Sequence, residues 1–218
     1  MKIDSTRFIE VVSDNKVVPV FNHDNKDVAL NVLRACYEGG IRSFEFTNRS
    51  AQAVDVFKFL SSMRSEFPGL LLGVGSLVEI ETTKKYQDLG ADFFVSPIID
   101  TEMAAYCSQN DLVWVPGCGT LTEIVTAKRM GASLMKVFPA DVLGPKFVKG
   151  VLGPCPELKL MPTGGVLPTK QNLEEWFTAG VTCVGMGSQL ITRQLIENEE
   201  YDQLKRKVEN MMEYVQSI

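Results

Sequence analysis

Histidine is almost absent from this chain, and cysteine occurs without any ligand-like spacing. The single histidine is His23, which excludes a metal site built from several histidines and any catalytic triad that does not use His23. The cysteines are odd in number, and no two of them form a Cys-x-x-Cys pair. They are Cys36, Cys107, Cys118, Cys155 and Cys183. We therefore expect reduced thiols in a cytoplasmic protein that holds no metal.

Long apolar runs and clusters of basic residues are also missing. No apolar stretch approaches the ~18 residues of a membrane span, and residues 1–5 lack the apolar core of a signal peptide. The net charge is −5 and no Lys/Arg-rich run occurs. This charge pattern argues against nucleic acid or an anionic membrane as a partner.

What the chain does have is a regular alternation of short apolar runs and amphipathic segments. The runs predicted as strands are Val17–Phe21, Ser43–Thr47, Leu70–Gly73, Asp92–Ser96, Val113–Pro116, Leu134–Phe138, Leu158–Pro162 and Thr182–Gly185. The segments predicted as helices are Lys26–Glu38, Ala51–Phe67, Ile80–Leu89, Glu102–Asn110, Leu121–Met130 and Thr169–Ala179. Glycines follow several of these helices, as C-cap glycines do.

Repeated strand–helix units of this kind predict a parallel sheet, and eight of them predict a closed (β/α)8 TIM barrel. A doubly wound open sheet is the alternative. No linker-like composition divides the chain, so we expect a single domain over residues 1–218. Two segments lie outside the repeat: Ile3–Ser13 is predicted as an extra N-terminal helix, and Tyr201–Gln216 as a C-terminal helix.

Lys136 is the most informative residue of the chain, because it interrupts an otherwise apolar predicted strand. Burial disfavours the charged ammonium form, and a free amine at a strand end is what Schiff-base formation with a ketone requires. The alternative is a structural lysine that pairs with a carboxylate or extends to the surface. If the amine is unpaired, Lys136→Ala abolishes turnover without destabilising the fold, whereas a marked loss of stability indicates a structural ion pair.

Glu45 is predicted to point into the barrel, because strand alternation places Phe44 and Phe46 on the opposite face. A carboxylate there is either a general acid/base or half of an ion pair, with Lys136 as one possible partner. Arg49 follows the same strand, and its guanidinium can bind a carboxylate with two hydrogen bonds. The alternative for Arg49 is an ordinary surface arginine.

Glycine-rich loops follow the last two predicted strands, which is where barrels bind phosphate through backbone N–H groups and a short extra helix. The first loop contains Gly164 and Gly165, and the second contains Gly187 and Ser188. We expect the extra helix to begin at Ser188. The alternative for these glycines is a plain turn.

With these features the chain resembles the class I 2-keto-3-deoxy-6-phosphogluconate (KDPG) aldolases, a family that includes 4-hydroxy-2-oxoglutarate (KHG) aldolases. The resemblance covers nearly the whole chain. It is carried by Glu45-Phe46-Thr47-Asn48-Arg49-Ser50, Gly73-Val74-Gly75-Ser76, Ser96-Pro97, Lys136-Val137-Phe138-Pro139-Ala140, Pro162-Thr163-Gly164-Gly165 and Gly187-Ser188.

The resemblance implies a role for each of these positions. Lys136 forms the imine, and Glu45 moves protons directly or through a water. The pyruvate end is held by Arg49, Ser76 and Thr163 in a pocket shaped by Pro97 and Phe138, and the distal phosphate by Gly164, Gly165, Gly187 and Ser188. Family members are typically homotrimers, so a homotrimer is also implied.

The chain departs from the family pattern at four positions on the expected pocket wall. The family usually has leucine where this chain has Asn48, threonine at Ser50 and Ser76, and often glycine at Ile98. None of these changes removes the imine chemistry, but they leave open which keto acid is preferred.

The predicted reaction is cleavage of KDPG to pyruvate and glyceraldehyde 3-phosphate, with cleavage of KHG to pyruvate and glyoxylate as a second substrate pair. An imine is its own electron sink, so the reaction needs neither metal nor other cofactor. One alternative is an aldolase for a related keto acid, either 2-keto-3-deoxy-6-phosphogalactonate or an unphosphorylated one. Further alternatives are a phosphate-binding barrel that acts as an isomerase or epimerase, and a non-catalytic binder.

Overall fold

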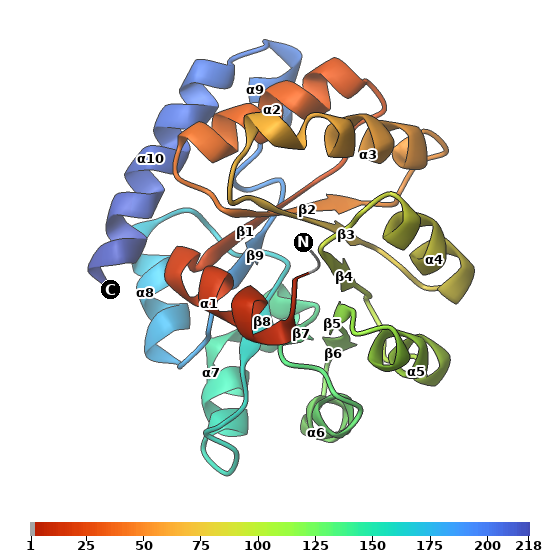
Figure 1. Cartoon of the computed structure of the whole chain (residues 1–218). Coiled ribbons are helices and arrows are strands. Elements are labelled where there is room, and N and C mark those ends of the chain that lie inside the picture. The colour runs from red at the N-terminus through yellow and green to blue at the C-terminus, as the bar shows by residue number, and fades with distance from the viewer. Residues whose placement is uncertain (1–2) are drawn as a thin grey trace.

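The fold is a ring of parallel strands surrounded by helices (Figure 1). The structure is a computed structural model that describes residues 3–218, so Met1 and Lys2, the first two residues of the predicted domain, lie outside the described residues. The strands are β1 (Val17–Phe21), β2 (Ser43–Thr47), β3 (Leu71–Gly75), β4 (Phe93–Val95), β5 (Val113–Val115), β6 (Gly117–Cys118), β7 (Met135–Val137), β8 (Leu160–Pro162) and β9 (Val184–Met186).

The strand order closes into a barrel. Hydrogen-bonded neighbours run β5-β4-β3-β2-β1-β9 and β6-β7-β8, all in parallel. A bridge between Thr163 and Gly185 joins β8 to β9, and β5 and β6 are two pieces of one strand interrupted at Pro116. The ring therefore has eight strand positions, which confirms the predicted (β/α)8 barrel and excludes the open sheet.

The helices form the outer layer, apart from α1 at one end of the barrel (Figure 1). Their bounds are α1 (Ser5–Asn15), α2 (Lys26–Glu38), α3 (Ala53–Ser62), α4 (Ile80–Asp88), α5 (Thr101–Gln109), α6 (Leu121–Arg129), α7 (Ala140–Leu152), α8 (Lys170–Thr178), α9 (Arg193–Glu197) and α10 (Tyr201–Ser217). A short 3-10 helix, η1 (Arg64–Glu66), follows α3. Among residues 3–218, no helix combines the length and hydropathy that a membrane crossing needs.

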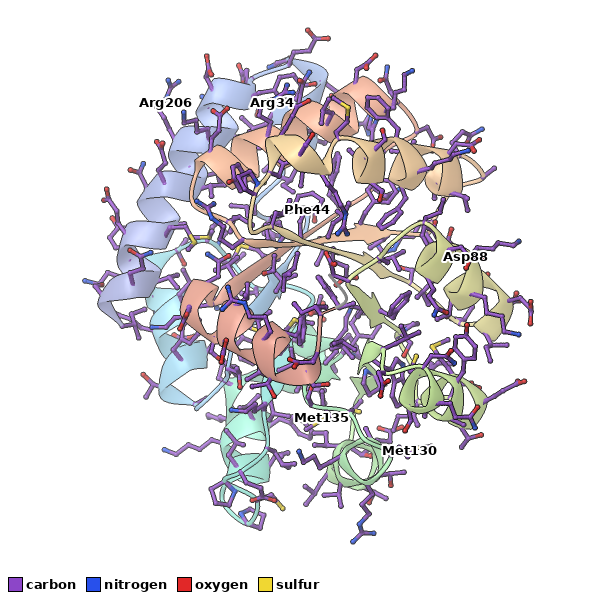
Figure 2. All side chains as sticks on the ribbon, viewed as in Figure 1. Arg34, Phe44, Asp88, Met130, Met135 and Arg206 are labelled. Atoms are coloured by element: carbon purple, nitrogen blue, oxygen red, sulfur yellow. The ribbon has the colours of Figure 1, made fainter. Side chains whose placement is uncertain are left out.

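Strand alternation divides the core into two clusters. Outward side chains such as Phe44 and Met135 pack against the helices, while charged residues such as Arg34 and Asp88 lie on the molecular surface (Figure 2). Inward side chains form a second cluster inside the barrel, which α1 closes from the end where the strands begin. Phe8 of α1 packs on Phe93 with ring centroids 5.1 Å apart. The functional site therefore lies at the opposite end of the barrel, where the strands have their carboxyl ends.

Three helical segments differ from the sequence expectation. Helix α7 was not predicted, and α9 begins at Arg193, later than the extra helix expected from Ser188. Gly144 inside α7 has a φ of 72° and precedes Pro145, so the backbone kinks there and the pattern of one regular helix is lost. The predicted helix Ala51–Phe67 is shorter, because α3 ends at Ser62 and η1 follows.

Candidate active site

Lys136 and Glu45 meet inside the barrel, where strand alternation placed Glu45 and where Lys136 was one of its possible partners. Lys136 lies in the middle of β7, and Glu45 in the middle of β2. The Nζ atom of Lys136 lies 3.6 Å from Oε1 of Glu45, with 5% of the lysine side chain exposed and none of the glutamate. The structure therefore contradicts the premise of an unpaired amine, and removing Lys136 would leave a buried carboxylate without its counter-charge.

Two glycines in β3 make room inside the barrel, Gly75 for the Glu45 carboxylate and Gly73 for the Phe93 ring. β2 pairs with β3 so that Glu45 lies opposite Gly73, and Thr47 lies opposite Gly75. A Cβ atom at Gly75 would overlap the carboxylate of Glu45, and one at Gly73 would overlap the ring of Phe93. Among residues 3–218, neither carboxylate oxygen of Glu45 has a hydrogen-bond partner. A buried carboxylate held only by an amine is expensive to maintain, which indicates a chemical rather than a structural role.

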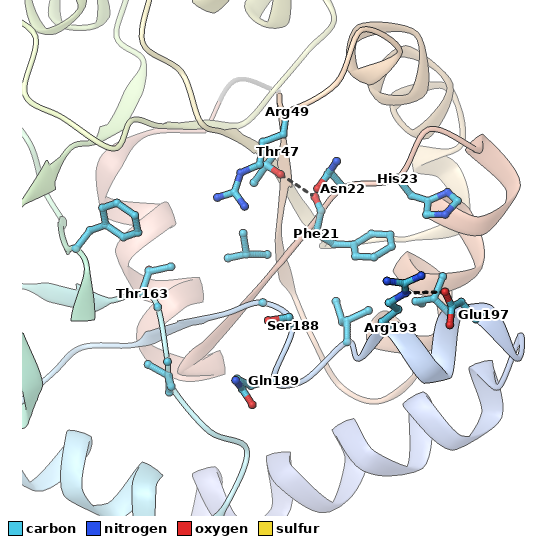
Figure 3. A pocket seen from close by; sticks show the side chains of 18 residues that line it. Phe21, Asn22, His23, Thr47, Arg49, Thr163, Ser188, Gln189, Arg193 and Glu197 are labelled. Atoms are coloured by element: carbon cyan, nitrogen blue, oxygen red, sulfur yellow. Dashed lines mark hydrogen bonds and ion pairs between the residues drawn. The ribbon is translucent and has the colours of Figure 1, made fainter. Parts of the chain in front are cut away.

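A cavity of about 650 Å³ opens at the carboxyl ends of the strands (Figure 3). Thr47 and Phe138 lie on its wall, two residues beyond Glu45 and Lys136 along the chain. Neither Glu45 nor Lys136 lines the cavity itself, and the pair lies below its wall, toward the interior of the barrel. The wall residues are Val20, Phe21, Asn22, His23, Thr47, Arg49, Phe138, Thr163, Gly164, Gly165, Val166, Gly187, Ser188, Gln189, Ile191, Arg193, Ile196 and Glu197.

Arg49 and Thr163 both line this cavity, from the segments that follow β2 and β8 (Figure 3). The Nε atom of Arg49 donates to Oγ of Ser76 at 2.9 Å, which links the loops after β2 and β3. The Oγ1 atom of Thr163 is buried and has no hydrogen-bond partner among the described residues. Gly185 allows Thr163 this close approach, because a Cβ there would overlap Oγ1. A ligand carboxylate is the kind of group that satisfies both side chains.

Four predicted residues are not among those that line this cavity: Lys136 and Glu45, which lie further inside on β7 and β2, and Ser76 and Pro97. Ser76 contacts it only through Arg49. Pro97 lies against β6, where a Cβ at Gly117 would overlap the Pro97 carbonyl group. Ser96 holds this segment by donating to the carbonyl of Ile98 at 2.7 Å.

The two glycine-rich loops do line the cavity, at its outer part. Gly164 and Gly165 have φ values of 104° and 71°, a backbone conformation that side chains other than glycine rarely adopt. Ser188, however, does not begin a helix. Leu190 and Ile191 donate their N–H groups to the carbonyl of Gly187 in a turn, and α9 begins at Arg193. The expected helix start was wrong, because Thr192 rather than Ser188 supplies the capping oxygen.

Sequence reasoning missed the part of the wall that follows β1. Phe21, Asn22 and His23 line the cavity, and the ring of His23 lies parallel to that of Phe21 with centroids 6.2 Å apart. The signal was present, because polar residues directly follow this strand as they follow β2. Arg193 was also missed; it pairs with Glu197 at 2.6 Å, and nothing in the pattern around it distinguishes it from a surface arginine.

Among the described residues, no other side chain near Lys136 competes with it as the nucleophile. Cys118 lies on the neighbouring β6, but burial raises the pKa of its thiol to about 12, so it is not a nucleophile near neutral pH. No cluster of three or more His, Cys, Asp or Glu side chains within residues 3–218 is arranged to hold a metal ion.

Comparison with known proteins places this barrel in one family. The family model of the KDPG and KHG aldolases matches residues 8–207. A 2-dehydro-3-deoxy-phosphogluconate aldolase of Treponema pallidum is 30% identical over 196 residues, covering 89% of this chain and 91% of the relative. One of Haemophilus influenzae is 29% identical over 216 residues, covering 99% and 100%.

A solved structure agrees with these matches. The KDPG aldolase of Legionella pneumophila, with pyruvate captured as a covalent carbinolamine intermediate, superposes with a TM-score of 0.84 at 26% identity, covering 93% of this chain and 97% of that one. The barrel with its buried amine and carboxylate thus defines an aldolase, a carbon–carbon lyase. The chain belongs to the KDPG and KHG aldolase family.

Proposed function

We propose that this protein is a class I aldolase that cleaves KDPG to pyruvate and glyceraldehyde 3-phosphate through an imine on Lys136. The observation that carries the proposal is the buried Lys136–Glu45 pair, with 3.6 Å between Nζ and Oε1, two residues before the cavity residues Phe138 and Thr47. The relatives named for this reaction and the family match support the substrate.

Imine formation begins with attack of the Lys136 amine on C2 of the keto acid. The attack gives a carbinolamine, which loses water to give a protonated imine. Among residues 3–218, Glu45 is the only carboxylate paired with this amine, so it is the group placed to take up and return protons during these steps.

Carbon–carbon cleavage then uses the imine as an electron sink. Glu45, directly or through a water, removes the proton of the C4 hydroxyl group, and the C3–C4 bond breaks with its electron pair moving to the imine nitrogen. This releases the aldehyde and leaves an enamine. The same carboxyl group returns a proton to C3, and hydrolysis of the imine releases pyruvate and regenerates the Lys136 amine.

The wall of the cavity supports an orientation for the substrate. We propose that Arg49 and Thr163 bind the carboxylate at the pyruvate end, because both are cavity side chains with hydrogen-bonding capacity to spare. Phe138 then packs on the keto acid beside the amine, since its ring lies 5.4 Å from Nζ of Lys136. The loops with Gly164, Gly165, Gly187 and Ser188 bind the phosphate.

The proposal is tested by following pyruvate release from purified protein with three substrates. These are KDPG, its C4 epimer 2-keto-3-deoxy-6-phosphogalactonate, and KHG. We expect the highest kcat/KM with KDPG and measurable cleavage of KHG, because a relative in Escherichia coli carries both names. Activity that survives EDTA supports the metal-free mechanism. Cleavage of none of the three, by folded protein, contradicts the proposal.

We also propose that residues 1–218 form one domain and that three copies assemble. The first strand pairs with the last, as β1 with β9, so strands near both ends of the chain close one ring. Large apolar side chains are exposed after five strands at one end of the barrel and give a trimer an apolar surface to bury. They are Val78, Ile98, Leu121, Val142 and Leu167. Light scattering on the purified protein measures the assembly.

We place the protein in the cytoplasm. All five cysteines are free thiols, and four of them are buried, which suits a reducing compartment. Fractionation of cells that produce the protein tests this placement.

A further inference from the structure

Tyr86 of α4 donates a hydrogen bond from its hydroxyl group to Oδ1 of Asn48, at 2.8 Å. Tyr86 is completely buried, and Asn48 is half-buried directly after β2. Asn48 is one of the positions at which the chain departs from the resembled family, where leucine is usual. A leucine offers no acceptor for a buried tyrosine hydroxyl group.

Asn48 stands between the catalytic strand and the predicted carboxylate-binding arginine. Its backbone N–H donates to the carbonyl of Gly75 at 2.8 Å, and the next residue, Arg49, donates from Nε to Oγ of Ser76 at 2.9 Å. The loop after β2 is thus tied at two adjacent residues to the end of β3 and to the residue that follows it. The Tyr86 bond adds a third connection, from the helix that follows β3.

The tyrosine is a rigid anchor for this connection. Its ring contacts that of Phe57 on α3 edge-on, with centroids 5.0 Å apart and an interplanar angle of 89°. Burial raises the pKa of Tyr86 to about 12, so its hydroxyl group stays protonated and remains a donor throughout the physiological range. Asn48 is therefore held from a fixed point in the outer layer of the barrel.

We infer that Tyr86 and Asn48 are positioning residues that fix the backbone carrying Arg49 and thereby set how its guanidinium meets the carboxylate of the keto acid. The inference rests on the proposed function, because it assigns Arg49 to that carboxylate. Neither residue touches Lys136 or Glu45 in this arrangement, so the pair acts on substrate binding and leaves imine chemistry unchanged.

Tyr86→Phe tests this role, since it removes the hydroxyl group and keeps the ring. We expect KM for KDPG to rise about threefold to tenfold, the range that one hydrogen bond supplies, while kcat is unchanged. Tyr106→Phe is the matched control, because Tyr106 on α5 donates to Gln87 on the same helix α4 but has no bond to the loop after β2. The control is expected to keep the wild-type KM.

Asn48→Leu provides a second variant in case Tyr86→Phe does not fold, as judged by thermal unfolding. It is expected to raise KM by a similar factor. The KM of the double variant is expected to be no higher than that of either single variant, because all three proteins lose the same hydrogen bond. Wild-type KM in both single variants overturns the positioning role, as does a fall in kcat at unchanged KM. If wild-type protein cleaves no keto acid and forms no borohydride-trapped pyruvate adduct, the proposed function fails and the inference fails with it.

Discussion

Gly75 faces Glu45 so closely across the β2–β3 pair that any side chain at position 75 would overlap the glutamate carboxylate. We expect Gly75→Ala to displace the carboxylate from the Lys136 amine and to lower kcat by about 10²-fold or more, the typical contribution of a positioned acid/base. Steady-state kinetics on the purified variant measures this.

Gly150→Ala is the matched control for that substitution. Gly150 lies in α7, and a Cβ there meets no atom within 4 Å. The control is expected to keep full activity and to gain about 0.5–1 kcal/mol of stability, because alanine is the better helix former. Full activity in Gly75→Ala contradicts a role for the glutamate.

Lys136→Met is expected to abolish turnover and to destabilise the fold by about 3 kcal/mol, because it leaves the buried Glu45 carboxylate without a counter-charge. The double variant Lys136→Met/Glu45→Gln is expected to recover most of that stability but none of the activity. Denaturant unfolding of wild type, both single variants and the double variant measures the coupling. Additive stability losses indicate that the two groups do not interact.

Gly165→Ala is expected to act on the distal end of the substrate alone. Its φ is 71°, and a Cβ there would lie 2.5 Å from Cβ of Asp141, so alanine must shift the loop. We expect kcat/KM to fall strongly for KDPG and little for KHG, which has no phosphate. An equal loss for both substrates shows that this loop does not bind the phosphate.

The five thiols are expected to separate into one reactive and four protected groups. Burial raises the pKa of the Cys107 and Cys118 thiols to about 12, and the pKa values of Cys36 and Cys183 are also raised by burial. At pH 8 a thiol of pKa about 12 is thiolate in roughly one molecule in 10⁴. Cys155 is part-exposed and should react first with a maleimide, as peptide mapping shows. Early labelling of a buried cysteine contradicts the packing described here.

The barrel and the inward direction of Glu45 followed from sequence because both depend on local periodicity. Alternation placed Phe44 and Phe46 against the helices and Glu45 inside, and all three lie where it put them. The same rule aims Lys136 inward from β7. Parallel closure then brings the two strands into one ring, so the residues that face inward at the same level meet.

The features that could not be predicted from the sequence depend on contacts between distant elements. The kink at Gly144 and the start of α9 at Arg193 depend on how the chain crosses the outer layer. The distance of 3.6 Å between Lys136 and Glu45 arises from barrel closure, so an ion pair stayed one alternative among several until the structure was known. The bond from Tyr86 to Asn48 joins residues 38 positions apart, and no local pattern signals it.

Trapping of the imine tests the central claim most directly. Incubation with pyruvate followed by borohydride reduces an imine to a stable secondary amine, which mass spectrometry of the peptides can locate. We predict one pyruvate-derived adduct on Lys136 in the wild type and none in Lys136→Met. Folded wild-type protein without an adduct on Lys136, or with its adduct on another lysine, would contradict this account.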